Sequence, residues 1–441
     1  MQSINLIPFI NKSVTPFHAV LEVKQILSQN GFAEISMEQN WTLEENRSYF
    51  TTIYDSTLIA FSIGSLPALA NRTPASAQYN NEDSAAIPRL KMASAHTDFP
   101  CFRVKPASDV KDKTYVRLNV EPYGGLIHGS WLDRPLSVAG KIAVASDNVF
   151  EPEIRFLCID RPLLTIPGLA IHMDREINKG KKLDLQKEML PLFSTVDESG
   201  DFLDFLAKEA GISDKNDILD FDLYVFNQET GCYFGKEEEF ISSPRLDNMT
   251  SVLACTKGIL DSAKENEIHV IALYDNEEIG SRTKQGADSM LTNLFLQKLY
   301  TSIGFSNETM VSSMMKGFFL SLDVAHGYHP AHPEKNDITN FATLNNGICI
   351  KMNYSQKYAT DTKAIAALVS LCQKHHISYQ KYVNRSDIAG GGTMGSISSS
   401  WMPMCTADVG VPILSMHSAR ETMGAKDQQQ LEHLVHAFFM E

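Results

Sequence analysis

Hydrophobic runs alternate with amphipathic segments along the second half of the chain. Runs of apolar residues predict buried strands at 270–274, 318–322, 348–352 and 411–416. Helical spacing of apolar residues predicts helices at 248–265, 292–300, 362–375 and 432–439. This order of elements predicts an α/β fold around a largely buried sheet.

The first half has a different pattern. Thr15 followed by Pro16 predicts the start of a helix that ends at Gly31. Strands are predicted within 48–63 and at 92–98. From 101 to 236, strand-like runs at 115–120, 136–144 and 221–226 are separated by Gly, Pro and Asp, with one helix at 199–210. We therefore predict a β-rich insertion at 101–236 in a domain formed by 1–100 and 237–441, with an exposed polar loop at 71–88.

Composition excludes several classes of protein. The net charge of −14 offers no basic stripe for phosphates, so we expect no nucleic-acid partner. The 7 cysteines are scattered without a Cys-x-x-Cys pair, which argues against a disulfide framework or a cysteine-zinc site. No apolar stretch is long enough to span a membrane and no signal peptide is visible, so we expect a cytoplasmic protein.

Candidate chemistry recurs at one structural position, just after a predicted strand. The residues are His96 with Asp98, Glu277 with Glu278, Asp323, and His417, and Asp247 joins them directly before a predicted helix. Ligands of α/β proteins lie at the carboxyl ends of strands, and a buried carboxylate needs a cation, a hydrogen bond or a proton. An isolated Glu-Glu pair is more often a solvated turn, but the recurrence favours a metal site.

The donor types indicate the metal. Histidine and carboxylate ligands suit zinc above all, with cobalt or manganese as possible substitutes. Two histidines and three carboxylates exceed the needs of one tetrahedral zinc but fit two ions that share a bridging carboxylate. Asp98 can accept the second ring N–H of His96, and one of the paired glutamates is left as a base.

Three other motifs have simpler interpretations. The run GGGTMG at 390–395 matches a dinucleotide-binding pattern but lacks a buried strand before it, so a tight loop is favoured. His329 and His332 lie between prolines and could form a second metal site, although shaping a loop is the better interpretation. Cys101 has no His or Asn partner that would indicate a nucleophile.

Several long motifs carry a family resemblance: HTDFPCFRVKP, YGGLIHGSWLDRPLSVAGK, ISSPRLDN, DNEEIGS, SLDVAHGYHPAHPEK, KMNYSQKYATD and VGVPILSMHSARE. Their order resembles the aspartyl aminopeptidase family of dinuclear zinc exopeptidases, nearly from end to end. The resemblance implies an aminopeptidase that releases N-terminal residues, preferably Asp or Glu, from peptides with a free N-terminus. It implies two zinc ions per subunit held by His96, Asp247, Glu278, Asp323 and His417.

The resemblance also implies the remaining roles. Asp247 would bridge the metals, Glu277 would be the general base assisted by Asp98, and the substrate contacts would be His172, His326, Lys351 and Tyr358. The expected fold is a metallopeptidase domain with a mixed central sheet flanked by helices, interrupted by a β-rich dimerisation domain. Dimers would build a homododecamer in which His172 reaches a neighbouring active site.

The chain departs from the family pattern at Phe99, His128 and Pro135, none of which is a proposed ligand. A non-catalytic metal-binding scaffold is the alternative function. Such a scaffold has no need of a base beside a ligand, so the intact Glu277 favours the enzyme.

Overall fold

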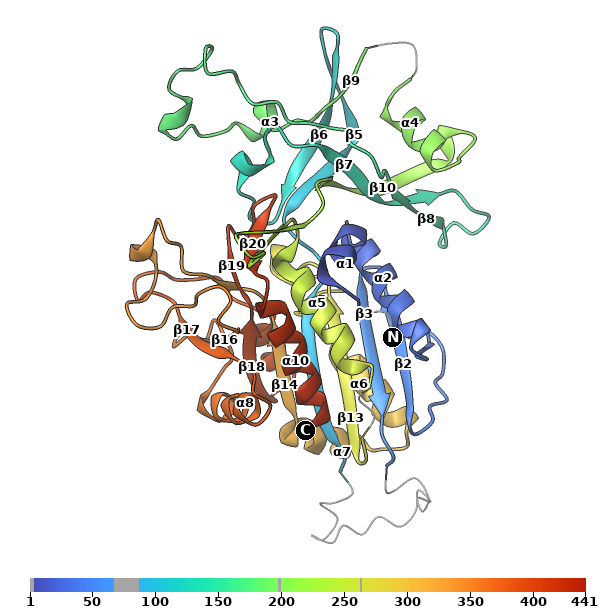
Figure 1. Ribbon diagram of the computed structural model, residues 1–441. Coiled ribbons are helices and arrows are strands. Elements are labelled where there is room, and N and C mark those ends of the chain that lie inside the picture. The colour runs from blue at the N-terminus through green and yellow to red at the C-terminus, as the bar shows by residue number, and fades with distance from the viewer. Residues whose placement is uncertain (1–3, 67–86, 197–199, 262–263) are drawn as a thin grey trace.

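The computed structural model describes residues 4–66, 87–196, 200–261 and 264–441 (Figure 1). Most of the predicted loop at 71–88 therefore lies outside the described residues. The chain has a mixed α/β fold in which a large sheet flanked by helices carries a second, smaller sheet at one end (Figure 1).

The central sheet is mixed. Within the described residues its strands follow the order β1 (Ala33–Glu34), β2 (Arg47–Ile53), β3 (Thr57–Ile63), β13 (Glu267–Tyr274), β4 (Arg89–His96), β14 (Phe318–Leu322), β18 (Cys405–Gly410), β16 (Ile348–Met352) and β17 (Tyr379–Val383). Strands β13, β4, β14 and β18 are parallel, whereas β3 and β16 pair antiparallel to this group. The four parallel strands therefore end at the same edge of the sheet.

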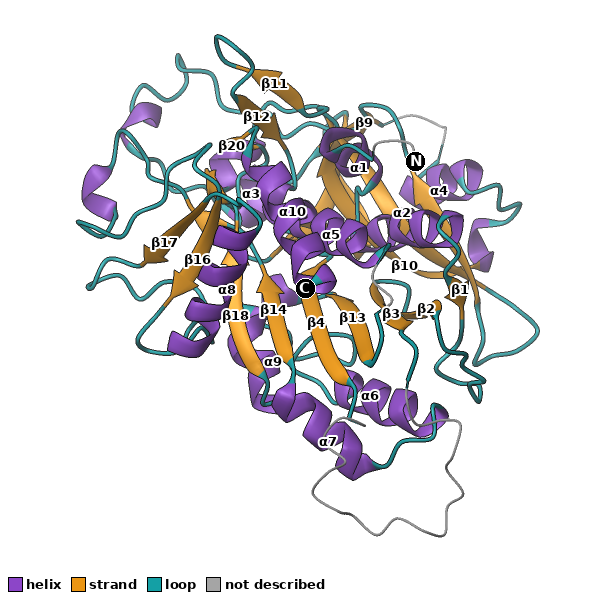
Figure 2. Cartoon of the chain, turned by 60° about the horizontal axis from the view of Figure 1, so that its bottom comes forward, coloured by secondary structure: helices purple, strands orange, loops and turns teal. Residues whose placement is uncertain are grey.

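Helices cover both faces of this sheet (Figure 2). Neighbouring strand residues point to opposite faces, so Ala93 and Met92 lie in different hydrophobic cores. The core around Ala93 includes residues of α1 (Leu6–Lys12), α2 (Pro16–Gln29), α5 (Leu246–Ile259), α8 (Thr362–Lys374) and α10 (Asp427–Met440). The core around Met92 includes residues of α6 (Leu291–Ser302), α7 (Asn307–Lys316) and α9 (Met394–Trp401). Burial on both faces explains why the central strands read as continuous apolar runs.

The region between β4 and α5 forms a second sheet with its own core. Its strands are β8 (Glu153–Cys158), β7 (Leu136–Val144), β10 (Ile218–Asn227), β5 (Cys101–Asp112), β6 (Tyr115–Tyr123) and β9 (Leu192–Thr195), in that order. Helices α3 (Leu185–Glu188) and α4 (Phe202–Glu209) lie beside it (Figure 1).

A third, small sheet joins distant parts of the chain. Its order is β11 (Cys232–Phe234), β12 (Phe240–Ser243), β20 (Glu421–Gly424), β19 (Pro412–Leu414) and β15 (Ala325–His326). It brings the segment around His417 next to His326.

The structure corrects one predicted strand. The strand predicted at 411–416 is present as the shorter β19 at Pro412–Leu414, but it belongs to the small sheet, and the central strand is β18 at Cys405–Gly410. β18 carries the buried polar residues Thr406 and Asp408, which interrupt the apolar pattern expected of a central strand. Among the described residues, no helix is long and apolar enough to cross a membrane.

Candidate metal centre

Histidine and carboxylate side chains from five separate segments meet at the carboxyl edge of the parallel strands. His96 ends β4, Asp323 follows β14, and His417 follows β19. Glu278 lies in the 3₁₀ turn η6 (Glu277–Ile279) after β13, and Asp247 lies at the start of α5. The parallel register sets Tyr274, the last residue of β13, opposite His96, which brings the Glu277–Glu278 turn to the end of β4.

Asp247 lies at the middle of the cluster, with one carboxylate oxygen toward each side. Its Oδ1 is 3.3 Å from Nε2 of His96, which in turn is 3.6 Å from Oδ1 of Asp323. Its Oδ2 is 3.4 Å from Nε2 of His417, which is itself 3.4 Å from Oε2 of Glu278. Two groups of donors thus share Asp247, and a third, overlapping group consists of His96, Glu277 and Glu278.

This donor set fits a divalent cation. Asp247 is buried, and its Oδ1 has no hydrogen-bond partner among the described residues. A buried carboxylate oxygen without a partner is costly, and a cation between Asp247 and His96 removes that cost. Imidazole nitrogen and carboxylate oxygen are the ligands of catalytic zinc sites.

Asp98 supports the cluster in a way that the sequence does not indicate. Nδ1 of His96 lies 3.0 Å from the backbone oxygen of Asp98, whereas the Asp98 carboxylate oxygen is 3.4 Å away. The backbone carbonyl, rather than the expected carboxylate, is thus the closer partner of the ring. The carboxylate accepts the backbone N–H groups of Glu277 and Glu278, each at 3.1 Å.

Glu277 lies beside the ligands, and its side chain is held close to other carboxylates. Burial raises the pKa of Glu277 to about 8. The charge of His96 lowers this pKa, whereas the charges of Asp323 and Asp98 raise it further. A cation bound by the adjacent ligands lowers such a pKa again, because it favours the ionised form.

Two of the predicted substrate contacts are buried beside Asp323. The ammonium of Lys351 lies 3.1 Å from the backbone oxygen of Val324 and 3.4 Å from Oδ2 of Asp323. It also lies 5.1 Å from the ring centroid of Tyr358. Lys351 is only 1% exposed, so its charge acts at the floor of the site.

The other two predicted contacts are exposed. His326 lines a hollow of about 290 Å³ beside the centre. His172 lies in the second sheet's region, and no interaction within the described residues joins it to the other site residues. His329 and His332 were considered for a second metal site, and their ring centroids lie 5.1 Å apart with the rings tilted by 46°. Neither residue belongs to a group of potential metal ligands found among the described residues.

Sequence reasoning missed two residues that hold the ligands in place. The buried Glu421 accepts the backbone N–H of Asp247 at 3.0 Å and that of His417 at 2.9 Å. Tyr123 of β6 donates its hydroxyl to Oδ2 of Asp98 at 2.7 Å. Both residues lie in or beside the motifs quoted above. No sequence pattern around either residue indicates the group to which it is hydrogen-bonded.

Comparison with known proteins identifies the family. A family model described as aminopeptidase I zinc metalloprotease (M18) matches residues 9–439. The chain belongs to the M18 family. It is therefore a zinc metallo-aminopeptidase, in agreement with the resemblance seen in its sequence.

M18 relatives match over the full length. A probable M18 family aminopeptidase 2 of Clostridium acetobutylicum is 39% identical over 439 residues, 98% of this chain and 97% of the relative. A protein of the same description from Pseudomonas fluorescens is 33% identical over 440 residues, again 98% and 97% of the two chains.

Solved structures share the fold. A chain in the cryo-EM structure of the Ape4 and Nbr1 complex has a TM-score of 0.89 and 33% identity, covering 98% of this chain and 84% of that one. A chain of the S. cerevisiae mApe1 dodecamer has a TM-score of 0.81 at 24% identity, covering 99% and 95%. The expected α/β metallopeptidase fold is thus confirmed.

Proposed function

We propose that this aminopeptidase uses two zinc ions to release N-terminal residues, preferably Asp or Glu, with Glu277 as general base. The observation that carries the proposal is the arrangement around Asp247, whose two oxygens face separate groups of donors. A single ion would leave one of these groups without a cation.

In this proposal His96 and Asp323 would hold one ion, Glu278 and His417 would hold the other, and Asp247 would contribute to both. Zinc, or cobalt or manganese in its place, supplies a Lewis acid for the scissile carbonyl and lowers the pKa of the attacking water. Glu277 accepts the proton of that water and passes it to the leaving amine.

Asp98 positions the base. Its carboxylate accepts the N–H groups of both Glu277 and Glu278, so the two side chains leave the η6 turn in a fixed relation. The carboxylates of both glutamates stay close to His96, since candidate ligand atoms of these three residues lie within 4.8 Å of one another. We propose this positioning as the role of Asp98.

A preference for acidic N-terminal residues is supported by the charge around the site. The hollow next to the metal centre is lined by the basic or titratable side chains of His326, His329, Lys335 and Arg385. Lys351 adds a buried ammonium beside Tyr358. Burial lowers the pKa of His326, so the permanent cations are Lys335, Arg385 and Lys351, which favour a carboxylate side chain by charge-assisted contacts worth about 1.5–3 kcal/mol each.

We further propose that the second sheet, within 101–236, is a dimerisation domain of a homododecamer. The similarity of fold to the mApe1 dodecamer supports this assembly. His172 is exposed on the second sheet's side of the chain, where it is free to complete the site of a neighbouring subunit. The free thiols of all seven cysteines fit a cytoplasmic location, which we also propose.

One assay tests the proposal. Aspartyl-, glutamyl- and leucyl-p-nitroanilide are compared before EDTA, after EDTA and after added zinc, with light scattering on the same samples. We expect EDTA-sensitive activity, restored by zinc, that favours the acidic substrates and belongs to an assembled species. Faster cleavage of the leucyl substrate would refute the acidic preference, and a fully active monomer would refute the role of His172.

A further inference from the structure

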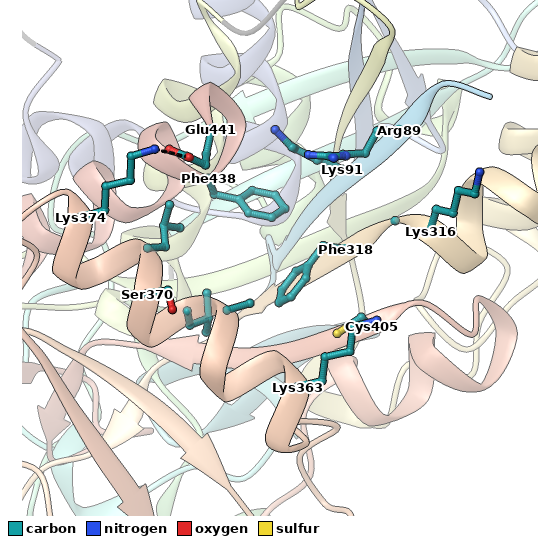
Figure 3. A pocket seen from close by; sticks show the side chains of 14 residues that line it. Arg89, Lys91, Lys316, Phe318, Lys363, Ser370, Lys374, Cys405, Phe438 and Glu441 are labelled. Atoms are coloured by element: carbon teal, nitrogen blue, oxygen red, sulfur yellow. Dashed lines mark hydrogen bonds and ion pairs between the residues drawn. The ribbon is translucent and has the colours of Figure 1, made fainter. Parts of the chain in front are cut away.

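A second hollow, of about 370 Å³, lies at the opposite end of the central sheet from the metal centre (Figure 3). Arg89, Phe318 and Cys405, the first residues of β4, β14 and β18, contribute to its wall. The remaining wall comes from α8, from the ends of α7 and α10, and from Lys91 of β4. These strands run from the hollow to the metal edge, so the hollow is no part of the catalytic site.

The floor of the hollow is apolar. The rings of Phe318 and Phe438 lie 5.8 Å apart and point into it (Figure 3). Ala367, Leu368 and Leu371 of α8 complete this surface. A concave apolar surface of this size is typical of sites for small ligands.

The rim is basic in a chain whose net charge is −14. The cationic lining residues are Arg89, Lys91, Lys316, Lys363 and Lys374. Some of these charges are already compensated, since Glu267 pairs with Arg89 and Lys91, and Glu441 pairs with Lys374.

Lys316 and Lys363 differ from the others. Within the described residues, neither ammonium pairs with a carboxylate, and both side chains are exposed. Lys316 ends α7 and Lys363 lies in the first turn of α8, so the two flank the ends of β14 and β18 (Figure 3). The hollow therefore combines an apolar floor with uncompensated positive charge on one side.

We propose that this hollow binds a small amphiphilic carboxylate. The alkyl chain lies on Phe318, Phe438 and the apolar residues of α8, and the carboxylate faces Lys316 and Lys363. A neutral apolar molecule would cover the same floor but leave these two ammonium groups without a counter-charge. Charge complementarity thus selects a carboxylate over an alcohol of equal length.

Calorimetry on the assembled enzyme tests the site with hexanoate, heptanoate and octanoate. We expect saturable binding that tightens about fourfold with each added methylene group. Octanol, which has the same chain without the charge, should bind about tenfold more weakly than octanoate. Equal affinity for octanol and octanoate, or no saturable binding, overturns the proposal.

Two variants distinguish the contribution of the lysine charges from that of the apolar floor. Lys316→Gln/Lys363→Gln should weaken octanoate about tenfold and leave octanol unchanged, whereas the matched control Lys111→Gln/Lys208→Gln, on the second sheet and α4, should change neither. Ala367→Trp replaces an exposed helical residue and should fill the hollow and abolish binding of both ligands. Unchanged octanoate affinity in either site variant overturns the proposal.

Cys405 provides a readout that does not depend on activity. Its partly buried thiol lines the hollow, and burial raises its pKa, so alkylation is slow enough to follow by peptide mass spectrometry. Octanoate should slow the alkylation of Cys405 at the concentrations at which calorimetry shows binding, while the exposed Cys158 reacts at an unchanged rate. Equal rates with and without octanoate would place the ligand elsewhere and overturn the assignment.

Discussion

Tyr123 donates its hydroxyl to Oδ2 of Asp98 at 2.7 Å. The same hydroxyl accepts a hydrogen bond from the side-chain amide of Asn276 at 2.9 Å, directly before Glu277 and Glu278 in the chain. A residue of the second sheet thus fixes the carboxylate that orients Glu277 and Glu278. The second sheet therefore helps to position the residues of the metal centre.

Tyr123→Phe should lower kcat about tenfold while leaving most of the zinc in place. The substitution removes a hydrogen bond to a charged group, worth about 1.5–3 kcal/mol, but no ligand. Steady-state kinetics with zinc analysis of the same preparation checks this. Tyr115→Phe, an exposed residue of the same strand, is the control and should behave as wild type.

Glu277→Gln should retain the metal and lose most turnover. The amide keeps the size of the side chain but cannot accept a proton, and loss of a general base costs on the order of 10²–10⁴ in rate. Near-normal kcat in a fully metallated preparation would show that another group is the base.

Asp247→Asn should lower zinc binding by both groups of ligands together. One carboxylate oxygen faces His96 and the other faces His417, so the loss of charge affects both sides. Zinc titration followed by metal analysis measures the stoichiometry and affinity. One zinc retained at wild-type affinity would argue against a bridging role.

Lys351→Met separates two roles for the buried ammonium. If Lys351 receives the acidic side chain of the substrate, as we expect, kcat/KM should fall by one to two decades for aspartyl-p-nitroanilide and far less for leucyl-p-nitroanilide. The contacts of Lys351 with Asp323 and Val324 define the other role, which is to position a ligand. An equal loss on both substrates would assign Lys351 to that role.

Glu267→Gln should destabilise the fold by about 2–3 kcal/mol at pH 7, because it leaves the buried Lys91 without its counter-charge. Despite burial, hydrogen bonds from His269 and Lys91 lower the pKa of Glu267 from its ordinary value to about 2. A depressed carboxyl pKa stabilises the fold above the unfolded-state pKa, and this contribution is lost as the pH falls toward 2.

The stability difference between wild type and Glu267→Gln should therefore be constant from pH 7 to about pH 5.5 and at least halved by pH 3. Urea unfolding across this range measures it, with the exposed Glu151→Gln as control. A difference that stays constant down to pH 3 would contradict the assignment of the low pKa to Glu267.

The sequence predicted those parts of the fold whose signal is local. The apolar runs mark the bounds of β14, β16 and β7 because these strands are buried, and Thr15 marks the start of α2 because its side chain caps the helix. The ends of the predicted strands also indicated the metal ligands, because the last residues of parallel strands lie at the same edge of the sheet.

The parts that were missed depend on contacts between distant residues. Glu421 is a buried acid whose partner, the N–H of Asp247, lies 174 positions away, and no periodicity signals such a pair. Tyr123 looks like any strand tyrosine until the second sheet is placed beside Asp98. The strand β18 was missed because its polar side chains are satisfied by partners elsewhere in the chain: the Asp408 carboxylate accepts the hydroxyl of Thr393 and the backbone N–H of Ala359.

The ligands of the metal centre are spread along most of the chain, from His96 to His417. During synthesis at roughly 5–20 residues per second, His417 therefore emerges roughly 15–60 s after His96. A ribosome-bound chain therefore lacks the complete donor set during that interval, and the metal centre can form only after His417 has emerged.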